Sequence, residues 1–65
     1  MMFTDRELAC LELIAQGFSN ERIVRKLELS SGTATRAISS LYRKLGAVDR
    51  ASAVANAFRR GLLVV

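Results

Sequence analysis

The sequence has no histidine, proline or tryptophan, and Cys10 is its only cysteine. A single cysteine excludes an internal disulfide, and without histidine it has no partners for a metal site. The same absences leave no nucleophile–base pair, so we do not expect an enzyme. No apolar run approaches the roughly 20 residues that span a bilayer, and acidic Asp5 and Glu7 are unlike the start of a signal peptide. We expect a cytoplasmic protein in a reducing setting, with no cofactor and no membrane partner.

About half of the 65 residues are apolar, and glycine occurs at only four positions. This composition predicts an all-α fold, a four-helix bundle that forms a single domain over residues 1–65. Apolar periodicity and Ser, Thr or Asp caps place the helices at about residues 4–16, 20–28, 31–45 and 49–60. The pattern T-x-x-E at residues 4–7 predicts a capping box at the start of the first helix.

The helix expected at residues 31–45 has two unlike faces. An apolar stripe contains Ala34, Ile38, Leu41 and Leu45, and the opposite face is small, polar and basic. A short helix that braces a longer, exposed helix is typical of domains that read the DNA major groove. The candidate base-reading residues are Thr35, Arg36, Ser39 and Ser40, and the candidate phosphate contacts are Ser19, Asn20, Ser31, Thr33, Arg43 and Lys44.

The positive charge lies mainly in the second half of the chain. Residues 1–29 contain four Lys or Arg against five Asp or Glu, whereas residues 30–65 contain six against one. A basic half favours a polyanionic partner, and double-stranded DNA is the partner that we expect. The alternative interpretation is that these cations are solvated and serve only solubility.

Two further features leave alternatives open. The helix expected at residues 49–60 has a wide apolar arc, which is either a dimer seam or a helix filled with alanine for its helix propensity. The candidate homodimer contacts are Ala53, Val54, Ala57 and Phe58. Glu7 lies on the apolar face of the first helix, so it either only closes the capping box or is partly buried and forms an ion pair with Arg50.

The chain resembles the LuxR-type (GerE-like) helix-turn-helix domain of bacterial transcription regulators. The resemblance extends from Phe3 to Leu63 and depends on Arg50 and four segments: TDRE at 4–7, AQGFSNERI at 15–23, LELSSGT at 27–33 and YRKLG at 42–46. It implies a winged-helix-like domain without a wing, whose third helix reads DNA and whose fourth helix often pairs two copies. It also implies a location at the bacterial nucleoid, RNA polymerase as a candidate partner, and a chain that is either an excised effector domain or a small stand-alone regulator.

The sequence departs from the family pattern in the reading helix. Where the family usually has T-V-K-x-H, this chain has TATRA at residues 33–37, so Thr35 and Ala37 replace Lys and His. This change shifts the expected specificity onto Arg36. Glu21 stands where Lys is common and brings a negative charge near the expected phosphate path. These departures favour a rival function, a protein-interaction module that binds or inhibits another regulator without binding DNA.

Overall fold

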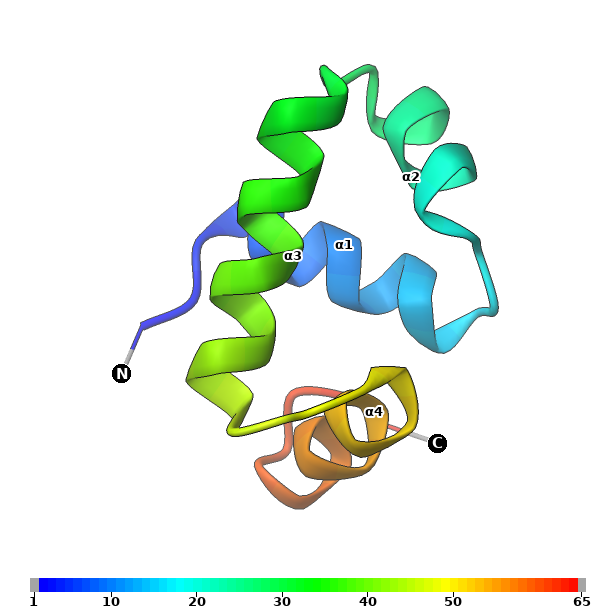
Figure 1. Cartoon of the computed structure of the whole chain (residues 1–65). Coiled ribbons are helices and arrows are strands. Elements are labelled where there is room, and N and C mark those ends of the chain that lie inside the picture. Colours follow the sequence, from blue (N-terminus) through cyan, green and yellow to red (C-terminus); the bar gives the residue numbers. More distant parts are fainter. Residues whose placement is uncertain (1, 65) are drawn as a thin grey trace.

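The described part of the chain, residues 2–64 of a computed structural model, consists of helices joined by short turns. The helices are α1 (Asp5–Ala15), α2 (Asn20–Leu27), α3 (Ser31–Leu45) and α4 (Arg50–Arg59) (Figure 1). There is no strand among the described residues. The prediction of four helices in an all-α fold is confirmed, and each predicted boundary lies within one residue of the observed one.

Side-chain caps define where the helices begin. Thr4 Oγ1 accepts a hydrogen bond from the Glu7 backbone N–H, and the Thr4 N–H donates to Glu7 Oε1, so the predicted capping box is present. Asp49 and Ser52 form a second capping box at the start of α4. Each cap satisfies N–H groups that have no partner inside the helix.

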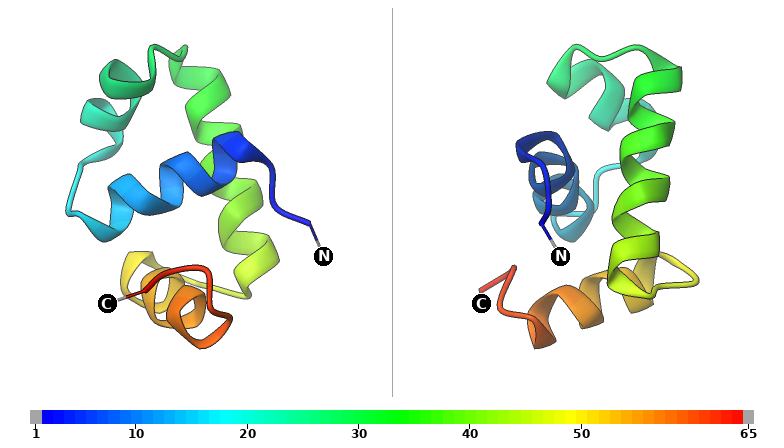
Figure 2. Two further views of the ribbon diagram at one scale, coloured as in Figure 1. Left: turned by 180° about the vertical axis from the view of Figure 1, so that it is seen from behind. Right: turned by 90° about the vertical axis from the view of Figure 1, so that its left-hand side faces the viewer.

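The longest helix, α3, organises the fold. It packs against each of the other helices, with α2 beside its first turns, α1 crossing behind its middle and α4 beside its end (Figures 1 and 2). Most of the core lies where these helices meet; its buried side chains include Cys10, Leu11, Ile14, Ile23, Ile38, Leu41, Leu45 and Leu63. Burial raises the pKa of the Cys10 thiol, consistent with a small core residue. No described helix is long and apolar enough to cross a membrane.

Candidate nucleic-acid interface

A tight turn sets α2 against α3. Glu28 caps the end of α2 in the left-handed conformation, with φ 55°, and the Leu29 N–H donates to the Val24 carbonyl at 3.0 Å. Glu28 therefore lies in the cap and not in the helix. As a result, α2 ends at Leu27, one residue before its predicted end. Ser30 then caps α3: its Oγ accepts from the Thr33 N–H at 3.1 Å, and its hydroxyl donates to Thr33 Oγ1 at 2.8 Å. The short turn leaves α2 and α3 in direct contact.

The two predicted faces of α3 are present. Ala34, Ala37, Ile38, Leu41 and Leu45 are buried, and they hold the helix against the core. The exposed residues on the helix are Ser31, Gly32, Thr35, Arg36, Ser39 and Arg43. Thr33 is half-buried. The outer face thus carries hydroxyl and guanidinium groups, and the apolar side chains of the helix point away from it.

The beginning of this outer face leaves room for close approach. A Cβ atom added to Gly32 would meet no atom from another part of the fold within 4 Å, so packing does not require a glycine there. Ser31 beside it is also small and exposed. Small side chains at the start of a reading helix allow its backbone to approach the edges of the bases.

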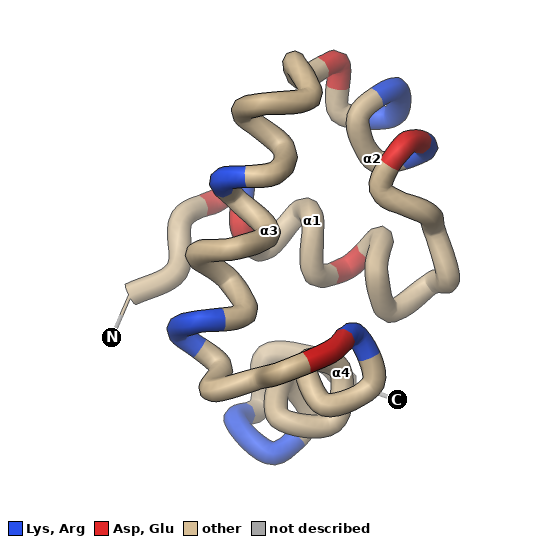
Figure 3. Tube along the Cα trace, in the orientation of Figure 1, with Lys and Arg blue, Asp and Glu red and all other residues tan. Residues whose placement is uncertain are grey.

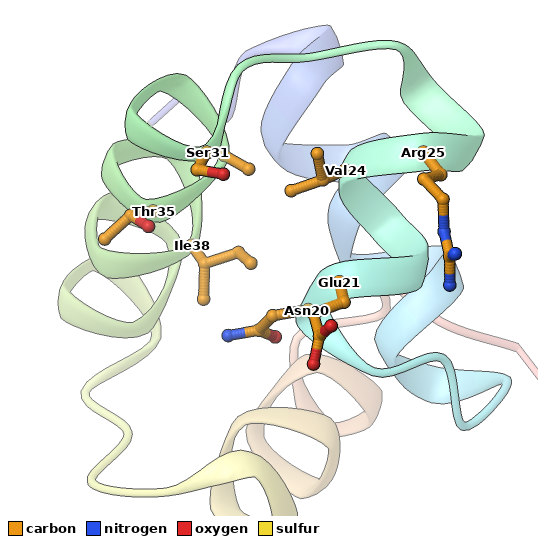
Figure 4. Close-up of a pocket in the computed structure, with 8 residues that line it drawn as sticks. Asn20, Glu21, Val24, Arg25, Ser31, Thr35 and Ile38 are labelled. Carbon is orange, nitrogen blue, oxygen red and sulfur yellow. The ribbon is translucent and has the colours of Figure 1, made fainter.

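A groove of about 290 Å³ separates the outer sides of α2 and α3 (Figure 4). Val24 and Ile38 contribute its apolar surface, and Asn20, Ser31 and Thr35 contribute polar groups. Glu21 also lines the groove, which places the expected negative charge at the boundary between the two helices. Ser19 caps α2 next to this groove, and its Oγ accepts from the Arg22 N–H at 3.3 Å. Ser19 and Asn20 are both exposed, as their proposed contact with phosphate requires.

Cations lie along α3 and at the ends of α4 (Figure 3). Arg36 and Arg43 are exposed and form no ion pair within residues 2–64, where Lys44 and Glu7 form the one salt bridge. Two of the four cations that the sequence places between residues 36 and 50 are therefore free to meet an external anion. The other two, Lys44 and Arg50, are bonded inside the fold.

Glu7 pairs with Lys44, and the predicted pair of Glu7 with Arg50 is wrong. Lys44 Nζ lies 2.8 Å from Glu7 Oε1 and also donates to the Met2 carbonyl at 2.9 Å. Glu7 is buried, yet it also closes the capping box, so both interpretations of this residue describe part of its role. These two bonds occupy two of the three N–H donors of the Lys44 ammonium group, so its predicted phosphate contact stays a prediction.

The surroundings of Glu7 stabilise its charged form. Burial by itself would raise the pKa of Glu7, but hydrogen bonds from Lys44, Ser40 and the Thr4 N–H lower it to about 2. Ser40 is half-buried, unlike the exposed Thr35, Arg36 and Ser39. The assignment of Ser40 to base reading stays a prediction, as do those of Thr35, Arg36 and Ser39.

Arg50 joins the start of α4 to the turn between α1 and α2. Its Nη1 donates to the Phe18 carbonyl at 2.7 Å and to the Ile14 carbonyl at 3.4 Å, and its Nη2 donates to Asn20 Oδ1 at 3.0 Å. Arg50 thus binds carbonyl groups near the end of α1 and fixes the first residue of α2. The oxygen of the Asn20 amide is occupied by this contact, but its NH₂ group makes no hydrogen bond within residues 2–64 and can still donate.

The apolar arc of α4 mostly faces inward. Ala53 and Ala57 are completely buried, so the prediction that they form a dimer seam is wrong. Val54 is half-buried against the core, whereas Phe58 is 41 % exposed, and Ala51 and Ala55 are exposed. The arc is wide because alanines lie on both the buried and the exposed side of α4. Of these alanines, only Ala51 and Ala55 are accessible to a second chain.

Comparison with known proteins identifies the family. Residues 1–57 match the GerE model of bacterial regulatory proteins of the luxR family. The chain belongs to the LuxR family. It is 36 % identical over 62 residues to the transcriptional regulatory protein YdfI of Bacillus subtilis (strain 168), a match that covers 95 % of this chain and 29 % of YdfI.

A solved structure supports the same assignment. The crystal structure of the response regulator ChrA of a heme-sensing two-component system superposes with a TM-score of 0.91 and 30 % identity, over 97 % of this chain and 31 % of ChrA. The LuxR-family chain thus spans less than a third of the length of these relatives. It is a helix-turn-helix DNA-binding domain of the kind found in bacterial transcription regulators, a family that is not enzymatic.

Proposed function

We propose that α3 enters the major groove of double-stranded DNA and reads its sequence. The observation that carries this proposal is the outer face of α3, where Thr35, Arg36 and Ser39 are exposed on a helix whose other face is fixed in the core. A guanidinium group can donate two hydrogen bonds to guanine O6 and N7, whereas hydroxyl groups discriminate less between bases. Arg36 therefore carries most of the base preference.

The residues beside this face hold the sugar-phosphate backbone. Ser19 and Asn20 lie at the start of α2, and Ser31 and Thr33 lie at the start of α3, where N–H groups favour anions. Arg43 lies two turns after Arg36 on the exposed side and reaches a phosphate farther along the groove. In this arrangement α2 rests on one strand while α3 lies in the groove.

The chain binds its site as a homodimer in this proposal. Phe58, with Ala51 and Ala55 on the accessible side of α4, supplies the apolar contact between two copies. Two copies related by a two-fold axis would read two half-sites on the order of 10 bp apart, or a multiple of that spacing. The domain spans residues 1–65 and acts as the DNA-binding unit of a transcription regulator at the nucleoid.

Selection of bound duplexes from a random DNA library, followed by binding titrations, tests this function. We expect one enriched half-site, tighter binding when two half-sites are present, and a steep loss of affinity as salt rises. Titrations on mixed-sequence DNA at low salt provide the decisive control. If the chain fails to bind any duplex at low salt, the DNA-binding proposal is overturned in favour of the protein-interaction module.

A further inference from the structure

A second, more polar hollow lies on the opposite side of α3 from the groove beside α2. It has a volume of about 280 Å³ and lies between the first turn of α1 and the first half of α3. Its lining residues are Thr4, Arg6, Glu7, Thr33, Arg36 and Ala37. Arg6 belongs to none of the contacts predicted from the sequence, and it is exposed.

The charges around this hollow leave it net positive. Two guanidinium groups, those of Arg6 and Arg36, border it and form no ion pair within residues 2–64. Its one carboxylate, on Glu7, is already neutralised by the Lys44 ammonium group at 2.8 Å. Like charges around a shared hollow repel one another unless an anion lies between them.

Two local features point to the same kind of ligand. Thr33 Oγ1 accepts the hydroxyl proton of Ser30, so the proton of the Thr33 hydroxyl is itself available for donation. Arg6 lies in the first turn of α1, where the helix dipole disfavours a cation. The position of Arg6 is therefore explained better by an external anion than by the stability of α1.

We propose that this hollow binds one phosphate of the DNA backbone, with Arg6 as the main contact and the Thr33 hydroxyl as a second donor. The inference rests on the proposed placement of α3 in the major groove. A helix in that groove has a phosphate backbone on each side. The start of α2 lies beside one backbone, and the hollow beside α1 faces the other. Arg6 thereby fixes the position of α3 between the two strands, while Arg36 reads a base.

The test compares the full chain with Arg6→Gln and, as a matched loss of one charge, Arg60→Gln. Arg60 is exposed at the end of α4, away from the hollow. We expect Arg6→Gln to weaken selected and scrambled duplexes equally, by about threefold to fivefold. It should also reduce the slope of log affinity against log salt by about 0.9. Arg60→Gln should change neither quantity, and Arg6→Lys should restore most of the salt slope.

Duplexes with a single neutral methylphosphonate identify the phosphate. One backbone position should weaken the wild-type chain when neutralised and leave the Arg6→Gln chain unaffected. If no position shows this difference, or if Arg6→Gln binds with the wild-type slope, the hollow is not a phosphate site. A wild-type chain that binds no duplex at all would instead overturn the proposed function, and the phosphate site with it.

Discussion

Arg43 and Lys44 are neighbours in the sequence, yet they belong to two different regions of the molecule. Arg43 lies on the outer face of α3 and is exposed, whereas Lys44 turns toward α1 and binds the buried carboxylate of Glu7. The same contrast separates Arg36, which is free, from Arg50, which binds the Ile14 carbonyl at the end of α1 and the Phe18 carbonyl in the turn after it. Arg36 and Arg43 thus form an outer region that is available to DNA. Lys44 and Arg50 form an inner region that stabilises the fold.

For Arg43 and Lys44, the helical step of 100° per residue decides which side chain faces solvent and which faces the core. Neighbouring residues on a helix point in directions nearly at right angles, so consecutive Arg and Lys side chains can face solvent and core. The charge of the second half of the chain therefore overstates the charge that DNA meets. Substitutions in the inner region should change stability, and substitutions in the outer region should change binding.

The largest expected effect is on stability, from Lys44→Ala. Removing the ammonium group leaves the carboxylate of Glu7 buried without its cation, which costs about 3 kcal/mol of unfolding free energy. In a domain of this size that loss is a large part of the total stability. Thermal unfolding followed by circular dichroism measures it. The double variant Glu7→Gln with Lys44→Met is the control, and it should recover much of the stability because no unpaired charge is left. A Lys44→Ala chain with wild-type stability but a flatter salt dependence of DNA binding would reverse our assignment.

The ion pair of Glu7 with Lys44 should also make the stability of the fold depend on pH in the acid range. The pKa of Glu7 is about 2, below its ordinary value of 4.5, so the charged carboxylate stabilises the fold at every pH above about 4.5. That contribution, up to about 3 kcal/mol, is lost as the pH falls from about 4.5 to about 2. Chemical denaturation at a series of pH values measures this loss.

Glu7→Gln is the matched variant for the acid experiment, because it cannot titrate. It should be less stable than the wild type at neutral pH, and the difference between the two chains should shrink toward pH 2. The exposed Asp49, whose pKa is lowered by hydrogen bonds from the Ser52 backbone and hydroxyl, titrates in both chains and cancels in the comparison. Parallel curves for the two chains would show that Glu7 is not the group responsible.

The next largest effect is expected from Arg50→Met, which should lower the free energy of unfolding by roughly 2–3 kcal/mol. The Phe18 and Ile14 carbonyls lose a charged donor, and the Asn20 side chain loses the contact that holds it at the start of α2. Because Asn20 is a proposed phosphate contact, DNA affinity should also fall, equally for all sequences. Thermal unfolding and binding titrations measure the two effects. A variant with weakened sequence preference but full stability would place Arg50 in the outer region instead.

Arg36→Ala should have the smallest effect on the fold, because its side chain is exposed and bonds to no residue in the described chain. Stability should stay within about 0.5 kcal/mol of the wild type. Binding to the selected half-site should weaken by about 1–3 kcal/mol, and the preference for one base should relax. Titrations against duplexes that vary each base in turn measure this change. Full affinity with unchanged preference would contradict the assignment of Arg36 to base reading.

Much of the fold follows from local patterns that the sequence displays directly. Thr4, Ser19, Ser30 and Asp49 each cap a helix within a few residues, so their effect does not depend on the rest of the chain. The two faces of α3 were predictable for the same reason, since the helical period alone places Ile38 and Arg36 on opposite sides. The family resemblance, carried by short segments across most of the chain, was also correct.

Other features were decided only when distant segments came together. The partners of Lys44 and Arg50 lie 30 to 42 residues away in the sequence, and no periodicity predicts which cation meets Glu7. The apolar arc of α4 likewise contains alanines that only packing could divide into buried Ala53 and exposed Ala55. Helix bounds and the two faces of α3 thus follow from the sequence by itself, because they depend on near neighbours along the chain. Ion pairs, buried alanines and the hollow beside Arg6 belong to the tertiary structure, because they depend on which surfaces meet in space.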